Sequence, residues 1–296
     1  MDVDGEMPEL HALASYYAGQ GGALWVAEDG NGVSGMIATR PAADGWEICR
    51  VYVRPSAHGS GLAHALLDTA EAHAITHGAE RLFLWSDTRF DRAHRFYEKR
   101  SYVRDGGVRA LNDLSHSLEY GYAKPVNGTL VLDVAAAESA ERRLGEMLIA
   151  CVTDGASVSF LRPLAPEKAR GFWRRMTRGV ASGDRLLLAA WRNGVLAATG
   201  SVDLATPENQ RHRAEVQKIL VDPAHRRLGL ARAILRGCEA ASVQAGRSLL
   251  ILDTKADDAG EALYRAEGWQ EYGRLAGHAV DVDGTPVTTV FFAKRV

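Results

Sequence analysis

The chain has few cysteines, and their spacing suggests neither cross-linking nor metal binding. Cys49, Cys151 and Cys238 form an odd set without a CxxC pair, which predicts no disulfide framework and no zinc site. A formal charge of −2 argues against a general nucleic-acid-binding protein. No apolar run reaches the length of a membrane span, and the polar, acidic beginning lacks the order of a signal peptide. We therefore expect a cytoplasmic protein that binds neither membranes nor nucleic acids.

One segment of the chain occurs twice. Residues 47–63 are EICRVYVRPSAHGSGLA, and residues 215–231 are EVQKILVDPAHRRLGLA. The offset between matching positions is constant at 168 residues, for example 223 minus 55. A period of this length indicates two related domains rather than a solenoid. The 296 residues, 46% of them hydrophobic, are enough for two cores of ordinary size.

Hydrophobic periodicity and turn residues predict an α+β layout for the first unit. The run Asp29-Gly30-Asn31-Gly32 is a strong hairpin signal between two apolar segments. Apolar residues at helical spacing predict the helix that follows the repeated segment. We expect helices at residues 8–20, 62–77 and 91–100, and strands at 24–27, 33–39, 46–53, 81–85 and 114–122.

A linker at residues 124–128 is followed by a second unit with a longer opening. We expect a strand at 129–134, helices at 138–152 and 166–181, and a hairpin turn at 192–194. The first order then repeats, with a strand ending at 221, a helix from 230, a strand at 248–253, a helix at 261–267 and closing strands.

These elements predict two tandem domains, each a mixed, mostly antiparallel sheet flanked by helices. The first is placed at residues 1–124 and the complete second at 129–296. The first lacks an opening strand and helix, through a real truncation, a start codon assigned too late, or a deletion compensated by the other unit. We expect the two domains to pack as a pseudo-dimer.

Each repeat contains a small-residue turn between a strand and a helix. Free amides at a helix N-terminus and the helix macrodipole attract anions, and small residues admit a pyrophosphate close to the backbone. A dinucleotide-binding GxGxxG is excluded because His64 stands where its third glycine belongs, and a P-loop lacks its Gly-Lys-Ser/Thr. For one copy alone, an ordinary glycine-containing turn is the alternative.

In the second copy the turn matches [Gln/Arg]-x-x-Gly-x-[Gly/Ala], while the first copy has His58 in place of the arginine or glutamine, which weakens the charge of that turn. By this turn the chain resembles the GNAT N-acetyltransferase superfamily over nearly its whole length. Both copies follow a Val-x-Pro strand exit and precede a helix that carries a tyrosine, Tyr97 or Tyr264. The resemblance implies acetyl-CoA as cosubstrate and no metal. It implies that the cofactor's pyrophosphate is bound by His58, Gly59, Ser60, Gly61, Leu62 and Ala63, and by Arg226, Arg227, Leu228, Gly229, Leu230 and Ala231.

The pantetheine arm carries amides and can add to a strand edge as another strand does. The resemblance therefore implies main-chain hydrogen bonds to the strand ends, whose side chains we expect in the core. These residues are Val51, Tyr52 and Val53 in the first unit and Ile219, Leu220 and Val221 in the second.

Amide formation from acetyl-CoA needs a proton acceptor for the amine. Glu47 and Glu215 lie eleven residues before the first residue of each turn, where several superfamily members place a strand glutamate that acts as this base. The alternative is a structural ion pair with a nearby arginine such as Arg50 or Arg213.

The departing thiolate needs a proton donor, and Tyr97 and Tyr264 match the superfamily's candidate general acid. Their alternative is a packed core tyrosine. Asp253 is a candidate for orienting the amine or for a second base, or else a cap or turn residue at the end of its strand. His73 and His77 have helical i, i+4 spacing without a third ligand, so we expect no metal site.

The second unit resembles the tabtoxin-resistance branch of the superfamily in the segments 155–160, 213–218, 250–254, 277–279 and 291–294. That resemblance implies an N-acetyltransferase for a primary amine of a small molecule, such as an amino-acid-like antibiotic or metabolite. Its alternatives are a protein acetyltransferase acting on lysine or N-terminal amines, and a CoA-binding module with one inactive domain. The second unit is expected to be the active one, because it is complete and keeps its turn arginines.

Overall fold

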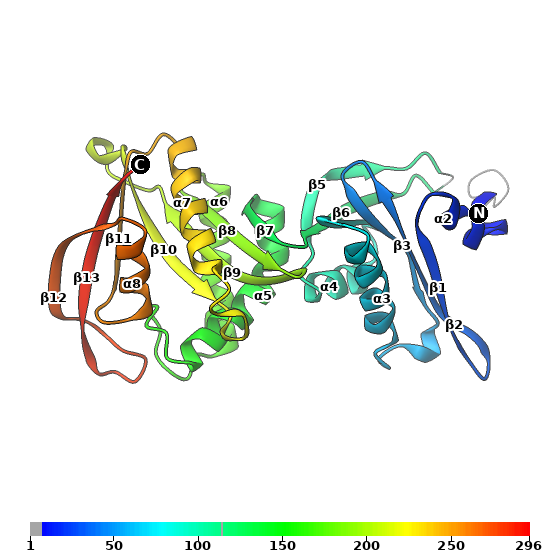
Figure 1. Cartoon of the computed structure of the whole chain (residues 1–296), viewed down its shortest axis with the longest axis horizontal. Coiled ribbons are helices and arrows are strands. Elements are labelled where there is room, and N and C mark those ends of the chain that lie inside the picture. The colour runs from blue at the N-terminus through cyan, green and yellow to red at the C-terminus, as the bar shows by residue number, and fades with distance from the viewer. Residues whose placement is uncertain (1–7, 114) are drawn as a thin grey trace. The chain divides into compact units, whose positions relative to one another are not determined.

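The computed structural model describes residues 8–113 and 115–296, and the chain divides into two compact units at residues 1–127 and 128–296. Each unit has one mixed sheet in which all but one pair of neighbouring strands is antiparallel, flanked by helices (Figure 1). The predicted fold class is confirmed.

The first unit has six strands in the order β1-β2-β3-β4-β6-β5. A 3-10 turn, η1, and a short helix, α2, replace the single helix expected at 8–20. Strand β5 was not predicted, and the expected strand start at Leu114 falls outside the described residues. The elements are η1 (Pro8–His11), α2 (Leu13–Gly19), β1 (Ala23–Asp29), β2 (Gly32–Ala42), β3 (Gly45–Val53), η2 (Pro55–Ala57), α3 (Leu62–Thr76), β4 (Arg81–Asp87), α4 (Asp91–Lys99), β5 (Val103–Ala110) and β6 (Leu118–Pro125).

The second unit has the same strand order, extended by β7 beside β8. Its elements are β7 (Gly128–Leu132), α5 (Val134–Thr153), α6 (Pro166–Ala181), β8 (Arg185–Arg192), β9 (Val195–Asp203), η3 (Glu208–Gln210), β10 (Arg213–Val221), η4 (Pro223–His225), α7 (Leu230–Gln244), β11 (Leu249–Lys255), α8 (Ala259–Ala266), β12 (Gln270–Val280) and β13 (Pro286–Arg295).

Three predicted boundaries are wrong. Helix α5 begins at Val134, inside the expected strand, because the Asp133 carboxylate caps it by accepting a 2.8 Å hydrogen bond from the Ala136 amide. Lys124 and the proline after it belong to β6, so only two residues separate the last strand of one unit from the first of the next. Asp253 lies inside β11, which continues to Lys255, and is neither a cap nor a strand end.

A close approach between α7 and the sheet organises the core of the second unit. Gly200 on β9 leaves room for it, because a Cβ there would lie 2.4 Å from Cγ2 of Ile234 and 2.7 Å from Cδ1 of Ile219. Helices α5 and α6 cover the other face of the sheet (Figure 1). Helix α7 begins directly after the repeated turn of the second unit, residues 226–229, so this packing holds that turn against the end of β10.

A buried ion pair ties α3 to β6 in the first unit. The Lys124 side chain is 2% exposed, and its Nζ lies 2.8 Å from Oε1 of Glu71 and donates to the Arg100 carbonyl at 2.9 Å. Glu71 also accepts hydrogen bonds from the Tyr102 hydroxyl at 3.0 Å and from the Arg100 guanidinium at 3.2 Å. Burial lowers the pKa of Lys124, although Glu71 opposes that shift.

The second unit repeats this arrangement between α7 and β13. Lys294 Nζ lies 2.7 Å from Oε2 of Glu239 and donates to the Glu267 carbonyl at 2.9 Å, while the Trp269 indole takes the place of the tyrosine at 2.9 Å. The Lys294 side chain is 23% exposed. The internal repeat therefore includes an equivalent lysine–glutamate ion pair in each unit, which joins the helix after the turn to a strand of the sheet.

Candidate active site

The sheet opens at the same place in both units, directly after the strand glutamate. Parallel pairing of β3 with β4 ends at Glu47, opposite Phe83, and that of β10 with β11 ends at Glu215, opposite Ile251. In the described chain these strands have no further ladder pairs with each other. Main-chain groups beyond each glutamate are therefore free on one side for a ligand that pairs like a strand.

A β-bulge lies on the other side of each of these strands. The β2–β3 register shifts between the pairs Ala38–Cys49 and Met36–Tyr52, and the β9–β10 register shifts between Gln217 and Leu220. Arg50 and Lys218 occupy the bulges with φ of 54° and 55°. Bulges re-aim side chains and are frequent next to active sites, and here both lie at matching positions of the repeat.

One expectation for the strand ends is wrong. Leu220 is buried, but the Tyr52 side chain is 55% exposed rather than part of the core. It borders a surface cavity of about 130 Å³ lined by Val33, Ser34, Gly35, Met36, Tyr52 and Arg54. The matching Leu220 is buried although Lys218 forms the same bulge, so the exposure of this position is particular to the first unit.

The two turns have the same backbone geometry. Gly61 and Gly229 precede α3 and α7 in the left-handed region, with φ of 90° and 79°. Two residues earlier, Gly59 and Arg227 also have positive φ, 81° and 65°. A Cβ at Gly61 or Gly229 would meet no atom within 4 Å, so backbone conformation rather than crowding calls for glycine. Both turns are exposed and present helix N-termini to solvent.

The turns differ in their cations. In the second unit Arg226 pairs with Asp154 at the end of α5, and Arg227 is exposed. In the first unit His58 has a ring nitrogen 3.0 Å from the Val53 carbonyl, and its other nitrogen lies 3.0 Å from Nη1 of Arg92 on α4. A guanidinium thus lies beside each turn, although it comes from a different element in each unit.

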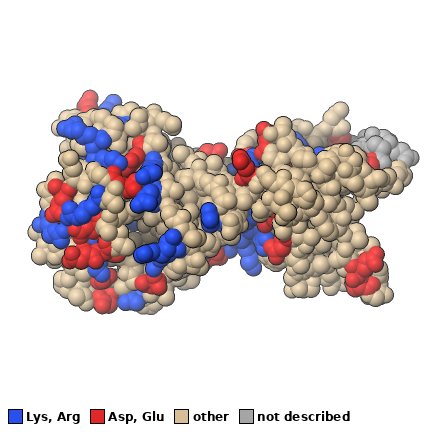
Figure 2. Space-filling model, viewed as in Figure 1, with Lys and Arg blue, Asp and Glu red and all other residues tan. Residues whose placement is uncertain are grey.

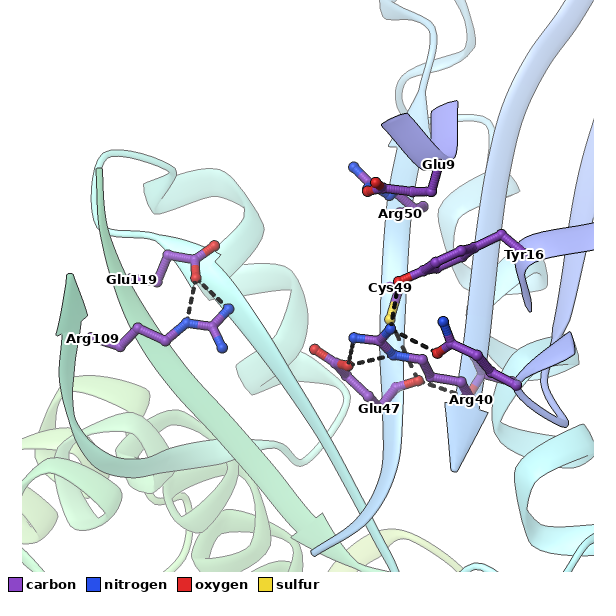
Figure 3. Close-up of polar contacts among 10 residues, drawn as sticks. Glu9, Tyr16, Arg40, Glu47, Cys49, Arg50, Arg109 and Glu119 are labelled. Atoms are coloured by element: carbon purple, nitrogen blue, oxygen red, sulfur yellow. Dashed lines mark hydrogen bonds and ion pairs between the residues drawn. The ribbon is translucent and has the colours of Figure 1, made fainter. Parts of the chain in front are cut away.

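Glu47 is held in an ion pair. It lies directly opposite Arg40 across β2 and β3, and its Oε2 accepts from Nε at 2.9 Å and from Nη2 at 2.7 Å (Figure 3). Nη1 of the same guanidinium donates to the Tyr16 hydroxyl on α2 at 3.1 Å. The structural alternative to a base is thus observed for Glu47, but with Arg40; Arg50 pairs instead with Glu9.

Glu215 has different surroundings. The residue opposite it on β9 is Asp203, and its Oε1 accepts a 2.8 Å hydrogen bond from the Gln217 side-chain amide. Among residues 8–113 and 115–296 no cation forms an ion pair with Glu215, so the expected alternative with Arg213 is not observed. A carboxylate with a neutral donor and no bound guanidinium keeps lone pairs for a proton at the opening of the sheet.

The sequence model of the acetyltransferase (GNAT) family matches residues 3–102 and 133–269. The chain belongs to this family. As a GNAT enzyme it is an acetyl-CoA-dependent acetyltransferase, with acetyl-CoA as cosubstrate.

Among solved structures, the enzyme is similar to two acetyltransferases. One is the phosphinothricin acetyltransferase of Sinorhizobium meliloti in complex with acetyl-CoA, at 16% identity over 58% of this chain and 89% of that chain, with a TM-score of 0.48. The other is the ribosomal-protein-alanine N-acetyltransferase of Brucella melitensis, at 20% identity over 57% and 99%, with a TM-score of 0.47.

The two helix tyrosines of the GNAT enzyme are buried at matching positions. Tyr97 on α4 and Tyr264 on α8 are less than 10% exposed, and burial raises the pKa of both hydroxyls well above 10. Tyr264 packs near Trp269 and Phe292. Neither hydroxyl has a hydrogen-bond partner within the described residues, so each remains protonated at neutral pH and available to donate.

Asp253 and Lys218 lie near Glu215 at the opening in the second unit. Lys218 donates from Nζ to the Ser159 hydroxyl at 3.0 Å, in the loop after α5. Burial lowers the pKa of Lys218, while the carboxylates of Asp253 and Glu215 oppose that shift. Asp253 is exposed and has no ion pair in the described chain. The Lys218 ammonium therefore interacts with the carboxylates of both Glu215 and Asp253 at this opening.

The first unit replaces this arrangement with one that is neutralised internally. The position that matches Asp253 is Trp85, and the Arg109 guanidinium lies 4.1 Å above its ring. Glu119 holds Arg109 through hydrogen bonds of 2.9 Å and 2.6 Å (Figure 3). No free carboxylate comparable to Asp253 lies at this point of β4.

The histidines singled out by spacing have aromatic neighbours. His73 on α3 and His77 at its C-cap have tilted rings with centroids 4.1 Å apart, and both rings pack against Trp46. Burial lowers the pKa of His73. Within the described residues no group of three or more His, Cys, Asp or Glu side chains is arranged to hold a metal ion.

No helix of the described chain is long and apolar enough to cross a bilayer. In the face shown in Figure 2, basic and acidic side chains are interspersed over the second unit, while acidic atoms gather at the β1–β2 hairpin, which carries Glu28 and Asp29. Charge of a single sign does not dominate the view.

Sequence reasoning missed the partners that distinguish the two glutamates. Arg40, Asp203 and Gln217 received no role, although Gln217 stands in the repeated segment where the first copy has Cys49. The available signal was this difference between the repeats. Its meaning depended on which β2 or β9 residue lies opposite each glutamate, and the bulged register decides that.

Proposed function

We propose that the second unit transfers the acetyl group of acetyl-CoA to a primary amine of a small molecule, with Glu215 as the base. The observation that carries this proposal is the contrast between the two glutamates. A proton arriving at Oε2 of Glu47 would have to displace two hydrogen bonds that the Arg40 guanidinium donates to that oxygen. Glu215 has only an amide donor and lies where β10 and β11 diverge.

In the proposed reaction the amine nitrogen attacks the acetyl carbon, the new C–N bond forms and the C–S bond breaks. Glu215 accepts the proton released from the nitrogen, directly or through a water. Tyr264 donates a hydrogen bond to the departing sulfur and supplies its proton as the thiolate forms, and the proton that Glu215 took up returns through solvent to the tyrosinate, so the cycle gains and loses no proton. Burial keeps the hydroxyl protonated at neutral pH, so a hydrogen-bond donor is in place when charge develops on the sulfur.

The proposed cofactor site consists of the turn residues Arg226–Ala231 and the main chain of residues 219–221. The left-handed Gly229 and the exposed amides of this turn suit a pyrophosphate. In the first unit, residues 58–63 and 51–53 form the corresponding candidate site. We assign no transfer reaction to that unit: Glu47 is paired, and Tyr97 is left with cofactor contact alone.

The acceptor side favours an amino-acid-like molecule. Asp253 and Glu215 can attract an ammonium group, whereas Lys218 can hold a carboxylate beside Ser159. A molecule carrying both groups complements this arrangement, whereas the flank of a lysine side chain in a protein offers no carboxylate at a fixed distance. We therefore propose a small amine acceptor that bears a carboxylate.

A thiol-release assay with acetyl-CoA and a panel of free amino acids, simple amines and lysine peptides tests this proposal. Glu215→Gln should lower kcat/KM by about 100-fold or more, the contribution of a positioned base, and the matched Glu47→Gln should leave it within about threefold. Lys218→Met should raise KM for carboxylate-bearing acceptors only. If Glu47→Gln lost activity while Glu215→Gln kept it, the assignment of Glu215 as the base would be refuted. Turnover of peptides alone would refute the small acceptor.

A further inference from the structure

Three charged residues lie in one row across the sheet of the second unit. Arg185 on β8 pairs with Asp203 on β9, which in turn pairs with Glu215 on β10. Side chains at directly opposite positions lie on the same face, and like charges in such a pair repel. The two adjacent carboxylates are compatible because Nη2 of Arg185 lies 2.5 Å from Oδ2 of Asp203.

The guanidinium reaches Glu215 only through a glutamine. Nη1 of Arg185 donates to Oε1 of Gln217 at 3.1 Å, and Nε2 of Gln217 donates to Oε1 of Glu215 at 2.8 Å. An arginine has no acceptor, so it must meet the amide oxygen of the glutamine. This contact fixes which end of the amide faces Glu215. Donation therefore runs outward from Arg185, to Asp203 on one side and through Gln217 to Glu215 on the other.

We propose that Gln217 is a positioning residue for Glu215, and that Asp203 keeps the Arg185 guanidinium away from the base. This inference rests on the proposed role of Glu215. A neutral donor on Oε1 orients the carboxylate and leaves Oε2 for the acceptor's proton. An arginine in direct contact would orient the carboxylate equally well, but it would stabilise the charged form and oppose protonation.

The first unit supplies the contrast within the same chain. Arg40 stands opposite Glu47, where Asp203 stands opposite Glu215, and Cys49 replaces Gln217. The guanidinium there contacts the glutamate directly. The equivalent strands thus hold the glutamate in an ion pair in the first unit and as an oriented carboxylate in the second. The difference lies in two positions, the residue opposite the glutamate and the residue two places after it.

Other titratable groups interact with Glu215 and are common to every variant below. Lys218 on β10 interacts electrostatically with it, as does Tyr272 on β12, whose own surroundings include Arg213 and Asp253. Because these groups stay in place, a change in the pH dependence of a Gln217 variant reports the loss of the amide contact.

The test compares Gln217→Leu and Gln217→Glu with Ser201→Ala. The serine variant is the matched control, because Ser201 donates to the Gln217 carbonyl at 3.2 Å and accepts from Arg185 at 3.3 Å without touching Glu215. We expect kcat to fall about 10- to 100-fold in Gln217→Leu, as for loss of a hydrogen bond to a charged group. The acidic limb of kcat/KM should move to higher pH, and KM for acetyl-CoA should stay within about threefold.

Gln217→Glu keeps the contact with Arg185 but loses the donor at neutral pH, so its activity should fall likewise. The inference is overturned if Gln217→Leu has the wild-type kcat and pH profile. It is also overturned if Ser201→Ala lowers kcat as much as Gln217→Leu does, or if Gln217→Leu lowers kcat without moving the pH profile. Glu215→Gln separates the two proposals: if that variant stays active, the proposed base fails, whereas an inactive Glu215→Gln beside an unaffected Gln217→Leu refutes only the positioning role.

Discussion

The repeated ion pair behind each turn-bearing helix gives a matched test of how burial sets its strength. The native Lys124 side chain is 2% exposed, and in Glu71→Ala its ammonium keeps the Arg100 carbonyl and the face of the Tyr102 ring, 4.4 Å away. Removing one partner of a buried pair costs about 3–5 kcal/mol, because it leaves an uncompensated charge. We expect Glu71→Ala to lower the free energy of unfolding of the first unit by this amount.

The corresponding change in the second unit should be milder. In Glu239→Ala the Lys294 side chain is 23% exposed and keeps the Glu267 carbonyl, so water can replace much of the lost contact. The loss should be about 1–2 kcal/mol, close to that of a hydrogen bond to a charged group. Lys124→Met should also cost less than Glu71→Ala, since Glu71 keeps its bonds to Arg100 and Tyr102.

Peptide-resolved hydrogen exchange on the full chain measures both losses, because α3 and α7 amides report the opening free energy of each unit separately. The expected result is a larger loss in α3 for Glu71→Ala than in α7 for Glu239→Ala, with the untouched unit unchanged. Equal losses, or a loss below about 1 kcal/mol in Glu71→Ala, would refute the argument from burial.

Three further experiments test the turn, the pH dependence and the packing. Gly229→Glu places a carboxylate in a left-handed turn (φ 79°) and should abolish acetyl-CoA binding to the second unit in calorimetric titration, whereas Gly61→Glu should affect only binding to the first; unchanged binding would contradict the turn assignment. The Asp257 amide and two guanidinium groups lower the pKa of Glu261 to about 2, so the unfolded state binds the extra proton and stability falls as pH drops from about 4.5 towards 2; Glu261→Gln should flatten that dependence in acid titrations, and an equally steep fall would refute it. Gly200→Ala should destabilise the second unit by about 1–3 kcal/mol in the same exchange experiment, because its Cβ meets Ile234, and a neutral result would mean that α7 shifts freely.

Much of the fold could be predicted because its signals are local. The repeated Val-x-Pro exit and small-residue turn place a strand end and a helix start next to each other, and α6 and the start of α7 occur where expected. The short strand β5 was missed because its run, with Gly106 and Gly107 at its centre, has little alternation of apolar and polar residues. Asp253 was placed at a strand end because the apolar run stops there, although the ladder with β13 continues.

The sequence by itself determined the duplication, the fold class and the turn that identifies the cosubstrate, since each depends on residues adjacent in the chain. Only the tertiary structure decided which glutamate is bound by a guanidinium and which by a neutral amide. Glu47 and Glu215 have the same place in the repeat, but their neighbours across the sheet are Arg40 and Asp203. That pairing follows from strand register, which core burial and the bulges set over many residues at once. The same holds for Lys124, whose partner on α3 lies 53 positions away along the chain, 124 minus 71.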